Sequence, residues 1–381
     1  MYRRTAIVFH SCAFLLMATL LDGTCAETAA APLPPGMQLE PLPLKVPEPA
    51  DNPSTPEKIA LGRLLFFDPI LSANRDVSCA TCHDPKYGWG DGRSTPIGVG
   101  GTGIGPGRTF VAGATFSPLT RNTPSLLNVG FNGVVAGTSD DPALAPMFWD
   151  ARVQGLERQV LVPMRSREEM RGEACAEQDA IPMAIARIAV IPGYRDRFAK
   201  AFNATTTNSA VNAVNLARAI AAFERSLVTA PTSYDRFLRG DKSALTAEQQ
   251  RGFKVFQEAG CVQCHGGPML SDFKLHFIGV QDDTPDGRRE FRTPSLRNLR
   301  HTGPYMHNGS QRTVRDILIF YEALSDAVSE TLDGGDTATQ PRLDPLLRHL
   351  NLSTEDIPAL EAFLDSLSTD QYDRSVPDKG R

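Results

Sequence analysis

The sequence contains Cys79-Ala80-Thr81-Cys82-His83 and, in its second half, Cys261-Val262-Gln263-Cys264-His265. Both stretches read C-x-x-C-H, the attachment signal for a c-type haem. Two thiols at this spacing can add to the two vinyl groups of one porphyrin, and the adjacent histidine then lies beneath the iron as its proximal ligand. Redox dithiols and zinc sites share part of the pattern, but two complete copies in an exported chain indicate two covalently bound haem c groups.

The first residues of the chain read as a secretory signal. Arg3 and Arg4 are followed by an apolar run over residues 13–21 and by Thr24-Cys25-Ala26 as a small-residue cleavage site. The run is short for a membrane span, and no later segment looks able to cross a bilayer. We therefore expect a cleaved signal peptide over residues 1–26 and a periplasmic protein that does not span the membrane, with a lipoprotein linked through Cys25 as the alternative.

The composition limits the partners and the covalent cross-links. The 381 residues include 39 Lys and Arg against 44 Asp and Glu, and the resulting net charge of −5 argues against nucleic acid as a partner. Of seven cysteines, Cys12 and Cys25 lie in the signal and four lie in the haem motifs. Only Cys175 is left. One cysteine cannot form an internal disulfide, so the bonds to the haem groups are the expected covalent cross-links.

Hydrophobic periodicity and turn residues divide the rest of the chain. With 41% hydrophobic residues, it can form one large or two medium-sized domains. Sparse strand signals predict a mainly α fold of two tandem cytochrome c-like haem domains with long loops, joined near the helix stop Gly240. The predicted parts are a proline-rich arm over 27–53, an N-terminal haem domain over 54–240, a C-terminal haem domain over 241–372 and a tail over 373–381. One predicted helix starts near Ser54-Thr55-Pro56-Glu57, which offers a cap candidate and a proline for the first turn, and others cover about 243–256, 314–324 and 355–367.

The two halves repeat the same landmarks, which indicates an internal duplication. Each motif is followed by the tetrapeptide Thr-Pro-Ser-Leu, at 123–126 and at 293–296. Setting Trp149 opposite His307 and moving fourteen residues on puts Pro163 opposite Tyr321. Proline has no side-chain atom that can coordinate iron, whereas tyrosine offers a phenol oxygen. If this position faces the haem iron, the repeat predicts one open and one closed iron, the layout of an enzyme rather than of an electron carrier.

The distribution of histidines supports an open first haem. Seven histidines occur in the chain, and none lies between His83 and His265. A ligand from the first half would have to be a methionine, for which apolar packing is the more ordinary role. The methionines in question are Met147, Met164, Met170 and Met183. His276, His301 and His349 are expected to be structural histidines.

From about Ser54 to Asp370 the chain resembles the bacterial di-haem cytochrome c peroxidases and, within them, the MauG-like branch. The order and spacing of several linked motifs carry the resemblance. They are Leu61-Gly62-Arg63-Leu64-Leu65-Phe66-Phe67-Asp68, Ser78-Cys79-Ala80-Thr81-Cys82-His83-Asp84-Pro85, Arg121-Asn122-Thr123-Pro124, Phe148-Trp149-Asp150, Glu168-Glu169-Met170 and Thr302-Gly303-Pro304-Tyr305-Met306-His307-Asn308-Gly309. The resemblance implies an oxidoreductase that contains two haem c groups and reacts with hydrogen peroxide.

The resemblance also implies roles for individual residues. His83 would be the proximal ligand of the peroxide-binding haem and His265 that of the electron-transfer haem. Tyr321 falls at the distal ligand of the second haem, where peroxidases proper have methionine and MauG has tyrosine. The implied catalytic residues are the acid–base carboxylate Glu169, the pocket residues Gln159 and Pro163, and Trp149 between the haems. An inter-haem calcium ion would be bound by Asn122 and by the backbone carbonyls of Thr302 and Pro304.

Three of these assignments have alternatives in the sequence. Glu168 replaces Glu169 if the register shifts by one residue, and Met306 is the rival of Tyr321 as axial ligand. Trp149 could be a core residue, although the only other tryptophan, Trp89, lies in a glycine-rich loop.

The predicted reaction is the activation of hydrogen peroxide, with Glu169 moving a proton from the inner to the outer oxygen. A tyrosinate ligand lowers the potential of the second haem, which favours oxidation of a protein or small redox partner without prior reduction. MauG carries a tryptophan two residues before its second haem cysteine, where this chain has Ala259, so methylamine dehydrogenase is not the expected partner. A conventional peroxidase using electrons from a small cytochrome or cupredoxin is the second hypothesis, and a non-catalytic di-haem electron carrier is the third.

Overall fold

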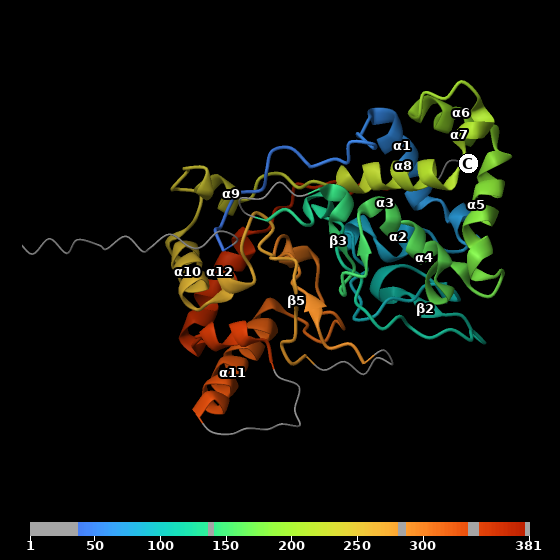
Figure 1. The fold of residues 1–381 in the computed structure, drawn as a ribbon. Helices are drawn as coiled ribbons and strands as arrows, with labels where there is room; N and C mark the ends of the chain where they lie inside the picture. The colour runs from blue at the N-terminus through green and yellow to red at the C-terminus, as the bar shows by residue number, and fades with distance from the viewer. Residues whose placement is uncertain (1–36, 136–140, 281–286, 334–342, 378–381) are drawn as a thin grey trace, which may run out of the picture. The chain divides into compact units, whose positions relative to one another are not determined.

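The structure, a computed structural model, describes residues 37–135, 141–280, 287–333 and 343–377. The predicted signal peptide and the start of the arm lie outside these residues. The chain is mainly helical, as predicted (Figure 1). Its helices are α1 (Pro56–Phe67), α2 (Cys79–Cys82), α3 (Leu156–Gln159), α4 (Leu161–Arg165), α5 (Ala180–Ala189), α6 (Pro192–Ala201), α7 (Thr207–Ala210), α8 (Ala213–Arg225), α9 (Ser233–Leu238), α10 (Ala247–Glu258), α11 (Val314–Asp333) and α12 (Ile357–Ser366). Every helix within the described ranges is too short or too polar to span a bilayer.

The strands are short and form three antiparallel pairs in the described part of the chain. Each pair closes a local loop rather than building a sheet. The pairs are β1 (Gly101–Thr102) with β2 (Thr109–Phe110), β3 (Pro146–Met147) with β4 (Val153–Gln154), and β5 (Leu275–His276) with β6 (Phe291–Arg292).

Helix α1 begins where the sequence predicted and packs on α8. Thr55 caps it by accepting a hydrogen bond from the backbone N–H of Lys58 at 3.2 Å, and Pro56 occupies the first turn. The two helices approach each other at Gly62, where an added Cβ would lie 1.9 Å from the carbonyl oxygen of Ala219. Only glycine permits a contact this close, so the helix crossing depends on that residue.

The second half repeats this crossing. Helix α10 packs on α12 (Figure 1), and a Cβ on Gly252 would lie 1.9 Å from the carbonyl oxygen of Ala359. Gly62 and Gly252 are equivalent residues in the helices that precede the two haem motifs. The shared crossing confirms the duplicated, mainly α architecture predicted from the sequence.

Three helix boundaries differ from the prediction. Helix α10 starts at Ala247 rather than near residue 243, because Thr246 caps it. Helix α11 continues to Asp333 instead of ending near residue 324, since Gly334 is the first residue after it that disfavours a helix. Helix α12 begins two residues later than predicted, because a 3₁₀ turn over Thr354–Asp356 precedes it.

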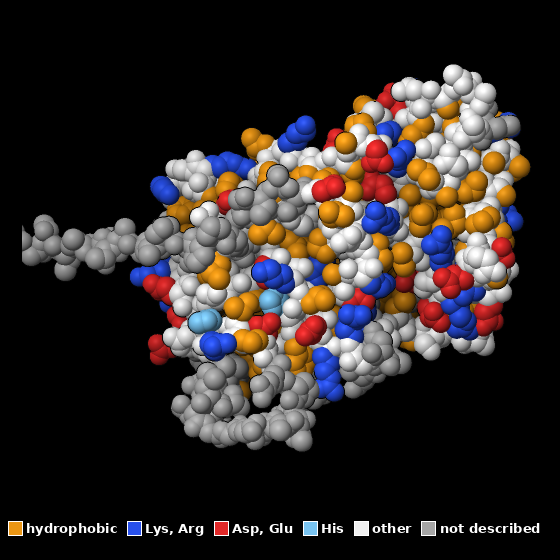
Figure 2. All heavy atoms as spheres, viewed as in Figure 1, with side chains coloured by type: hydrophobic (Ala, Val, Ile, Leu, Met, Phe, Trp, Pro, Cys, Tyr) orange, Lys and Arg blue, Asp and Glu red, His pale blue; other side chains and the backbone are white. Residues whose placement is uncertain are grey.

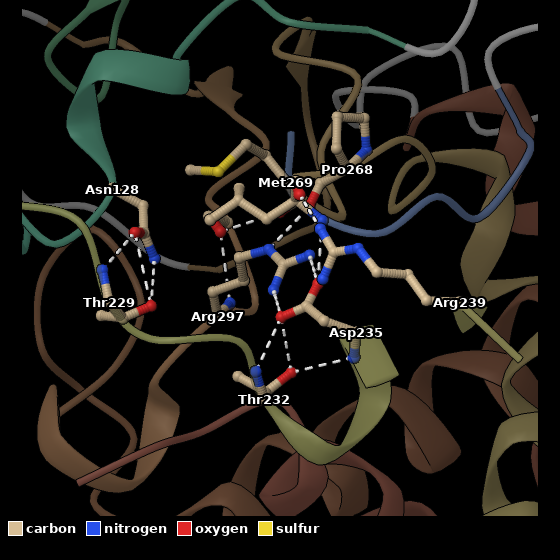
Figure 3. Close-up of polar contacts among 10 residues, drawn as sticks. Asn128, Thr229, Thr232, Asp235, Arg239, Pro268, Met269 and Arg297 are labelled. Carbon is tan, nitrogen blue, oxygen red and sulfur yellow. Dashed lines mark hydrogen bonds and ion pairs between the residues drawn. The ribbon is translucent and has the colours of Figure 1, made fainter. Parts of the chain in front are cut away.

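A buried ion pair ties the predicted junction to the second half (Figure 3). Asp235 of α9 lies 3.0 Å from a guanidinium nitrogen of Arg297, and both side chains are 1% exposed. The same carboxylate accepts the backbone N–H of Leu42 at 2.8 Å and the Thr232 hydroxyl at 2.8 Å. Burial alone would raise the pKa of Asp235, but the Arg297 charge and these hydrogen bonds hold it below its usual value. The Asp235 carboxylate therefore connects the N-terminal arm, through Leu42, and the second half, through Arg297, to helix α9.

The described surface carries mixed charge. On the face in Figure 2, acidic and basic side chains are interspersed with apolar ones, as the near balance of 39 cationic and 44 anionic residues predicts. Exposed large apolar side chains include Leu44, Ile104 and Val190. Single exposed apolar residues of this kind are ordinary in folded proteins.

Candidate active site

One cavity reaches both C-x-x-C-H motifs. Its volume is about 630 Å³, within the range of roughly 300–1,000 Å³ that is typical of ligand sites. Side chains of both halves form its wall, and much of that wall is apolar. The motif residues that line it are Cys82, His83, Cys261, Cys264 and His265. Cys79, the remaining motif cysteine, packs beside the apolar core of the first half.

Both motif histidines are held in the same way. Nδ1 of His83 lies 3.0 Å from the carbonyl oxygen of Trp89, and Nδ1 of His265 lies 2.8 Å from that of Leu270. This contact fixes the ring and leaves Nε2 available as a ligand atom. Burial lowers the pKa of His83 to about 4 and also lowers that of His265. Both imidazoles are therefore neutral at physiological pH, the form that coordinates iron.

These residues fit two haem c groups. Each motif offers a cysteine pair and a neutral imidazole beside one apolar cavity. Burial raises the pKa of Cys82 and of Cys261 to about 12, so these side chains are thiols rather than thiolates. The described cysteines form no disulfide, which leaves them free for attachment.

The repeated tetrapeptide positions the loop after each motif. The hydroxyl of Ser125 donates to the carbonyl oxygen of Gly88 at 2.6 Å, and that of Ser295 donates to the carbonyl oxygen of Met269 at 2.7 Å. Gly88 and Met269 each precede the residue whose carbonyl holds the motif histidine. The serines therefore stabilise the histidine-holding turns, a role that sequence reasoning missed although the repeat signalled it.

Glu169 lies on the cavity wall, within a single π turn over Arg167–Arg171. Burial raises the pKa of Glu169, while Arg152 and Ser166 partly oppose the effect. Glu168 does not line the cavity; its carboxylate pairs instead with Arg167 at 2.9 Å. Of the two glutamates that the sequence left open, only Glu169 is placed to meet a ligand in the cavity.

The π turn is held against the glycine-rich loop that follows the first motif. The backbone N–H of Val99 donates to the carbonyl oxygen of Glu168 at 3.0 Å. A Cβ on Gly98 would lie 2.2 Å from that same carbonyl oxygen and 2.6 Å from the carbonyl oxygen of Glu169. Gly98 is thus needed for the placement of Glu169. Its glycine-rich surroundings were visible in the sequence, but its contact was not.

Gln159 and Pro163 line the same cavity as Glu169. They come from α3 and α4, two short helices that follow one another through Val160. Among the four methionines considered as ligands, Met147 also lies on the cavity wall, and the other three do not line it. The sulfur of Met147 accepts a hydrogen bond from Asn132 at 3.7 Å.

The side chains of Tyr321 and Met306 reach the cavity from the second half. Burial, followed by the charges of Cys264 and Cys261, raises the pKa of Tyr321. The phenol therefore lies near the cysteines of the second motif. Pro163, its counterpart in the repeat, lies on the wall beside Glu169.

The two tryptophans occupy different environments. The indole Nε1 of Trp149 donates to the carbonyl oxygen of Asn122 at 2.8 Å, and the Trp149 carbonyl accepts the backbone N–H of Arg292 at 2.6 Å. Trp149 therefore lines the cavity while contacting both halves. Trp89 is fully buried and packs edge-to-face on Phe66 at 5.7 Å between ring centroids, so its glycine-rich loop folds into the core.

The three residues implied for calcium also line the cavity. Asn122 donates through Nδ2 to the carbonyl oxygen of Arg93 at 2.7 Å, which leaves its Oδ1 as an acceptor. The carbonyls of Thr302 and Pro304 would complete an all-oxygen set, the donor type that calcium prefers. The donor chemistry therefore fits a calcium ion.

A hydrogen-bonded carboxylate–histidine cluster lies beside the second motif. Nε2 of His276 is 3.0 Å from Asp272, and its Nδ1 is 2.6 Å from Asp344. Hydrogen bonds to Asp272, Cys264 and Asp344 raise the pKa of His276 to about 11. Cys264 lies close enough to share a metal with them. Since Cys264 belongs to a haem motif, the cluster is better read as support for that attachment site, in line with the structural role expected for His276.

Two C-x-x-C-H sites in a duplicated helical fold, facing one cavity, define a di-haem c-type oxidoreductase. The chain belongs to the di-haem cytochrome c peroxidase and MauG family. A family profile described as di-haem cytochrome c peroxidase matches residues 56–243. The chain is 33% identical over 348 residues to the methylamine utilization protein MauG of Methylorubrum extorquens, covering 88% of this chain and 85% of MauG. It is 31% identical over 398 residues to the cytochrome-c peroxidase IdrP1 of Denitromonas iodatirespirans, covering 93% and 92% of the two chains.

Solved structures agree with this assignment. A MauG-like protein associated with microbial copper homeostasis matches with a TM-score of 0.65 at 27% identity, over 87% of this chain and 93% of that one. The diheme peroxidase BthA from Burkholderia thailandensis, at 23% identity, shares the fold with a TM-score of 0.58 over 89% and 96%. Membership of the family implies two haem c groups and hydrogen peroxide as a substrate.

Proposed function

We propose that this protein is a periplasmic MauG-like oxidoreductase that uses hydrogen peroxide at an open site over His83 and oxidises an electron donor or a protein partner. One asymmetry carries the proposal. Non-coordinating Pro163 and half-buried Glu169 line the cavity from the first half, while Tyr321, the counterpart of Pro163, lines it from the second half. A duplicated scaffold with one closed and one open site suits catalysis, because an electron carrier has no use for an open iron beside a carboxylic acid.

When bound, the haems supply the two electrons that reduce hydrogen peroxide. The chain's own part is to admit and orient peroxide and to move protons. Pro163 leaves room because it offers no ligand, and Gln159 can donate a hydrogen bond to a peroxide oxygen. Glu169 accepts the proton of the inner oxygen and returns it to the outer oxygen, so the O–O bond breaks with water as the leaving group. The raised pKa of Glu169 suits this exchange, because its acid and base forms are then closer in free energy near neutral pH.

Trp149 is the proposed relay between the two sites. Its indole donates to a carbonyl of the first half, and its own carbonyl accepts from Arg292 of the second half. The first bond orients the indole ring, and the second anchors the backbone that carries it. An aromatic ring held in one orientation can pass an electron with little reorganisation.

Tyr321 is the proposed distal ligand over His265. A phenolate is an anionic oxygen donor that lowers the potential of the iron it binds. Such a second site would need no prior reduction and would favour oxidation of a partner. Ala259, at the position of the MauG tryptophan, is buried, so the partner we propose is a periplasmic redox protein or protein substrate other than methylamine dehydrogenase.

The first test is the spectrum of the resting ferric protein and its reaction with peroxide. We expect one high-spin and one low-spin haem, and rapid reaction of the all-ferric protein with hydrogen peroxide. Two six-coordinate low-spin haems with no high-spin species would remove the open-site proposal. A requirement for prior reduction would favour the conventional peroxidase instead.

Conventional cytochrome c peroxidase activity is the second candidate. One observation favours it: Met306, the rival ligand, also lines the cavity. A methionine ligand raises the potential and would make the second haem an electron acceptor from a small cytochrome or cupredoxin. Both functions place Glu169 and Pro163 in the same roles.

A calcium ion bound by Asn122, Thr302 and Pro304 is a further part of the proposal. It would lie where the loops of the two halves meet, because the backbone N–H of Asn122 donates to the carbonyl oxygen of His307 at 2.7 Å. Removal of calcium with a chelator should loosen that junction and slow transfer between the haems. Rescue by added calcium, but not by magnesium, is the outcome that supports the site.

A further inference from the structure

The cavity wall contains a buried cation that no carboxylate of the described residues neutralises. Arg292, in β6, is 8% exposed, and its side chain lines the cavity. Its Nε donates to the carbonyl oxygen of Phe148 at 3.0 Å, and its guanidinium carbon lies 5.5 Å from the ring centroid of Phe273. Burial lowers the pKa of Arg292 to about 10. A neighbouring carboxylate would have opposed that shift, and none does.

Two other arginines on the cavity wall have acidic partners. Arg297 pairs with Asp235 at 3.0 Å, and Arg152 pairs with Asp150 at 2.9 Å. Among the N–H groups of Arg292, the backbone N–H and Nε donate to protein acceptors within the described ranges. Burying an unpaired charge is costly, so an anion bound in the cavity would stabilise the remaining guanidinium N–H groups.

We propose that Arg292 is a carboxylate-binding residue that holds a propionate of a haem bound in this cavity. Haem carries two propionate carboxylates, and the planar guanidinium can bind one through two parallel hydrogen bonds. Both Nη nitrogens are available for this, because the protein contact of the side chain uses Nε. The inference rests on the two haem groups of the family and not on peroxide chemistry.

The position of Arg292 gives this contact a second consequence. Its backbone N–H donates to the carbonyl oxygen of Trp149, and its Nε donates to that of Phe148. One residue would therefore connect a haem carboxylate to the loop that carries Trp149. Asn122, the equivalent residue of the first half, carries no charge. At this position of the repeat, the cation therefore occurs in the second half alone.

The test is a potentiometric titration of the purified di-haem protein at several pH values, with each haem followed by its own absorption bands. In R292Q the haem whose propionate is bound should shift to lower potential, because a positive charge that favours the reduced iron is lost. Its potential should also become pH-dependent, because the released propionate then titrates near neutral pH. R292K keeps the positive charge but lacks the planar pair of Nη donors, so its potential should lie between those of R292Q and wild type.

Arg300 provides the matched control, since it forms a more exposed pair with Asp365 at 2.6 Å. R300Q should leave both potentials unchanged. If R292Q behaves like R300Q at every pH, the proposal is wrong. The haem whose potential shifts, high-spin or low-spin, is the one whose propionate Arg292 binds. If R292Q fails to take up haem, R292K alone decides: a wild-type potential overturns the proposal, and an intermediate one supports it. No peroxide turnover enters this measurement, so it is independent of the proposed function.

Discussion

The backbone N–H of Arg292 donates a 2.6 Å hydrogen bond to the carbonyl oxygen of Trp149. The equivalent residues of the repeat form the reciprocal bond: the N–H of Asn122 donates to the carbonyl oxygen of His307 at 2.7 Å. Each half therefore anchors the loop before its Thr-Pro-Ser-Leu segment on the other half. This pseudo-symmetric exchange fixes the spacing of the two haem sites, while the side chains at the same four positions differ and give the sites different chemistry.

Glu169→Gln should slow the reaction with hydrogen peroxide by roughly two to four orders of magnitude, the usual effect of removing a positioned acid–base group. Because the base form must accept the first proton, the wild-type rate should fall as pH drops through the pKa of Glu169, which burial raises above 4.5. This inflection should vanish in the variant. Stopped-flow measurements across pH check both effects.

Glu168→Gln is the control for this experiment. Glu168 pairs with Arg167 outside the cavity, so its variant should react within a few-fold of wild type. A large loss in E168Q with wild-type rates in E169Q would reverse the assignment of the two glutamates.

Tyr321→Phe should change only the low-spin haem, which would lose its six-coordinate signature because phenylalanine has no ligand atom. Met306→Leu should leave that signature intact. Absorption and electron paramagnetic resonance spectra of the ferric variants distinguish the two. A low-spin spectrum that survives in Y321F and disappears in M306L would assign the ligand to Met306 and support the conventional peroxidase.

Trp149→Phe should slow electron exchange between the two sites with little loss of stability, because Trp149 is only half-buried. Trp89→Phe should instead destabilise the protein and leave electron exchange between the two sites unchanged. Trp89 is fully buried among aromatic rings, so the smaller side chain should lower the free energy of unfolding by about 1–3 kcal/mol. Rapid-mixing kinetics and thermal unfolding, measured on both variants, should show this crossed pattern.

Gly62→Ala and Gly252→Ala should each destabilise the protein by at least about 1–3 kcal/mol, since the new Cβ would overlap a carbonyl oxygen at 1.9 Å. Gly193→Ala in α6 is the control: a Cβ there has no neighbour within 4 Å, and alanine favours a helix. Chemical unfolding should place G193A at or above wild type. Equal stability of all three variants would mean that the helix crossings adjust freely.

Asp235→Asn should lower the free energy of unfolding by roughly 3–5 kcal/mol, because it leaves Arg297 buried without its counter-charge. The pKa of Asp235 is lowered in the folded state, so the wild-type pair contributes fully above about pH 4 and is lost as pH falls through the lowered pKa. The difference between wild type and D235N should therefore shrink in acid. Urea unfolding at neutral and acid pH tests this sign.

Local patterns were enough to predict much of the site. The C-x-x-C-H spacing is a covalent requirement of the cofactor, and the Thr55-Pro56 helix start depends only on neighbouring residues. The repeat predicted that Trp149 and His307 are equivalent, and both do line one cavity. Predictions at helix ends were less accurate, because α10 and α12 begin where capping and a 3₁₀ turn compete with the hydrophobic period.

The two attachment sites, the duplication and the contrast between Pro163 and Tyr321 follow from residue type and spacing along the chain. That Glu169 rather than Glu168 reaches the cavity depends on folding, since a π turn held by Val99 sets which side chain faces inward. Folding also leaves Arg292 buried without a carboxylate partner among the described residues. Burial and charge pairing depend on segments far apart in sequence, and no local pattern records which of them meet.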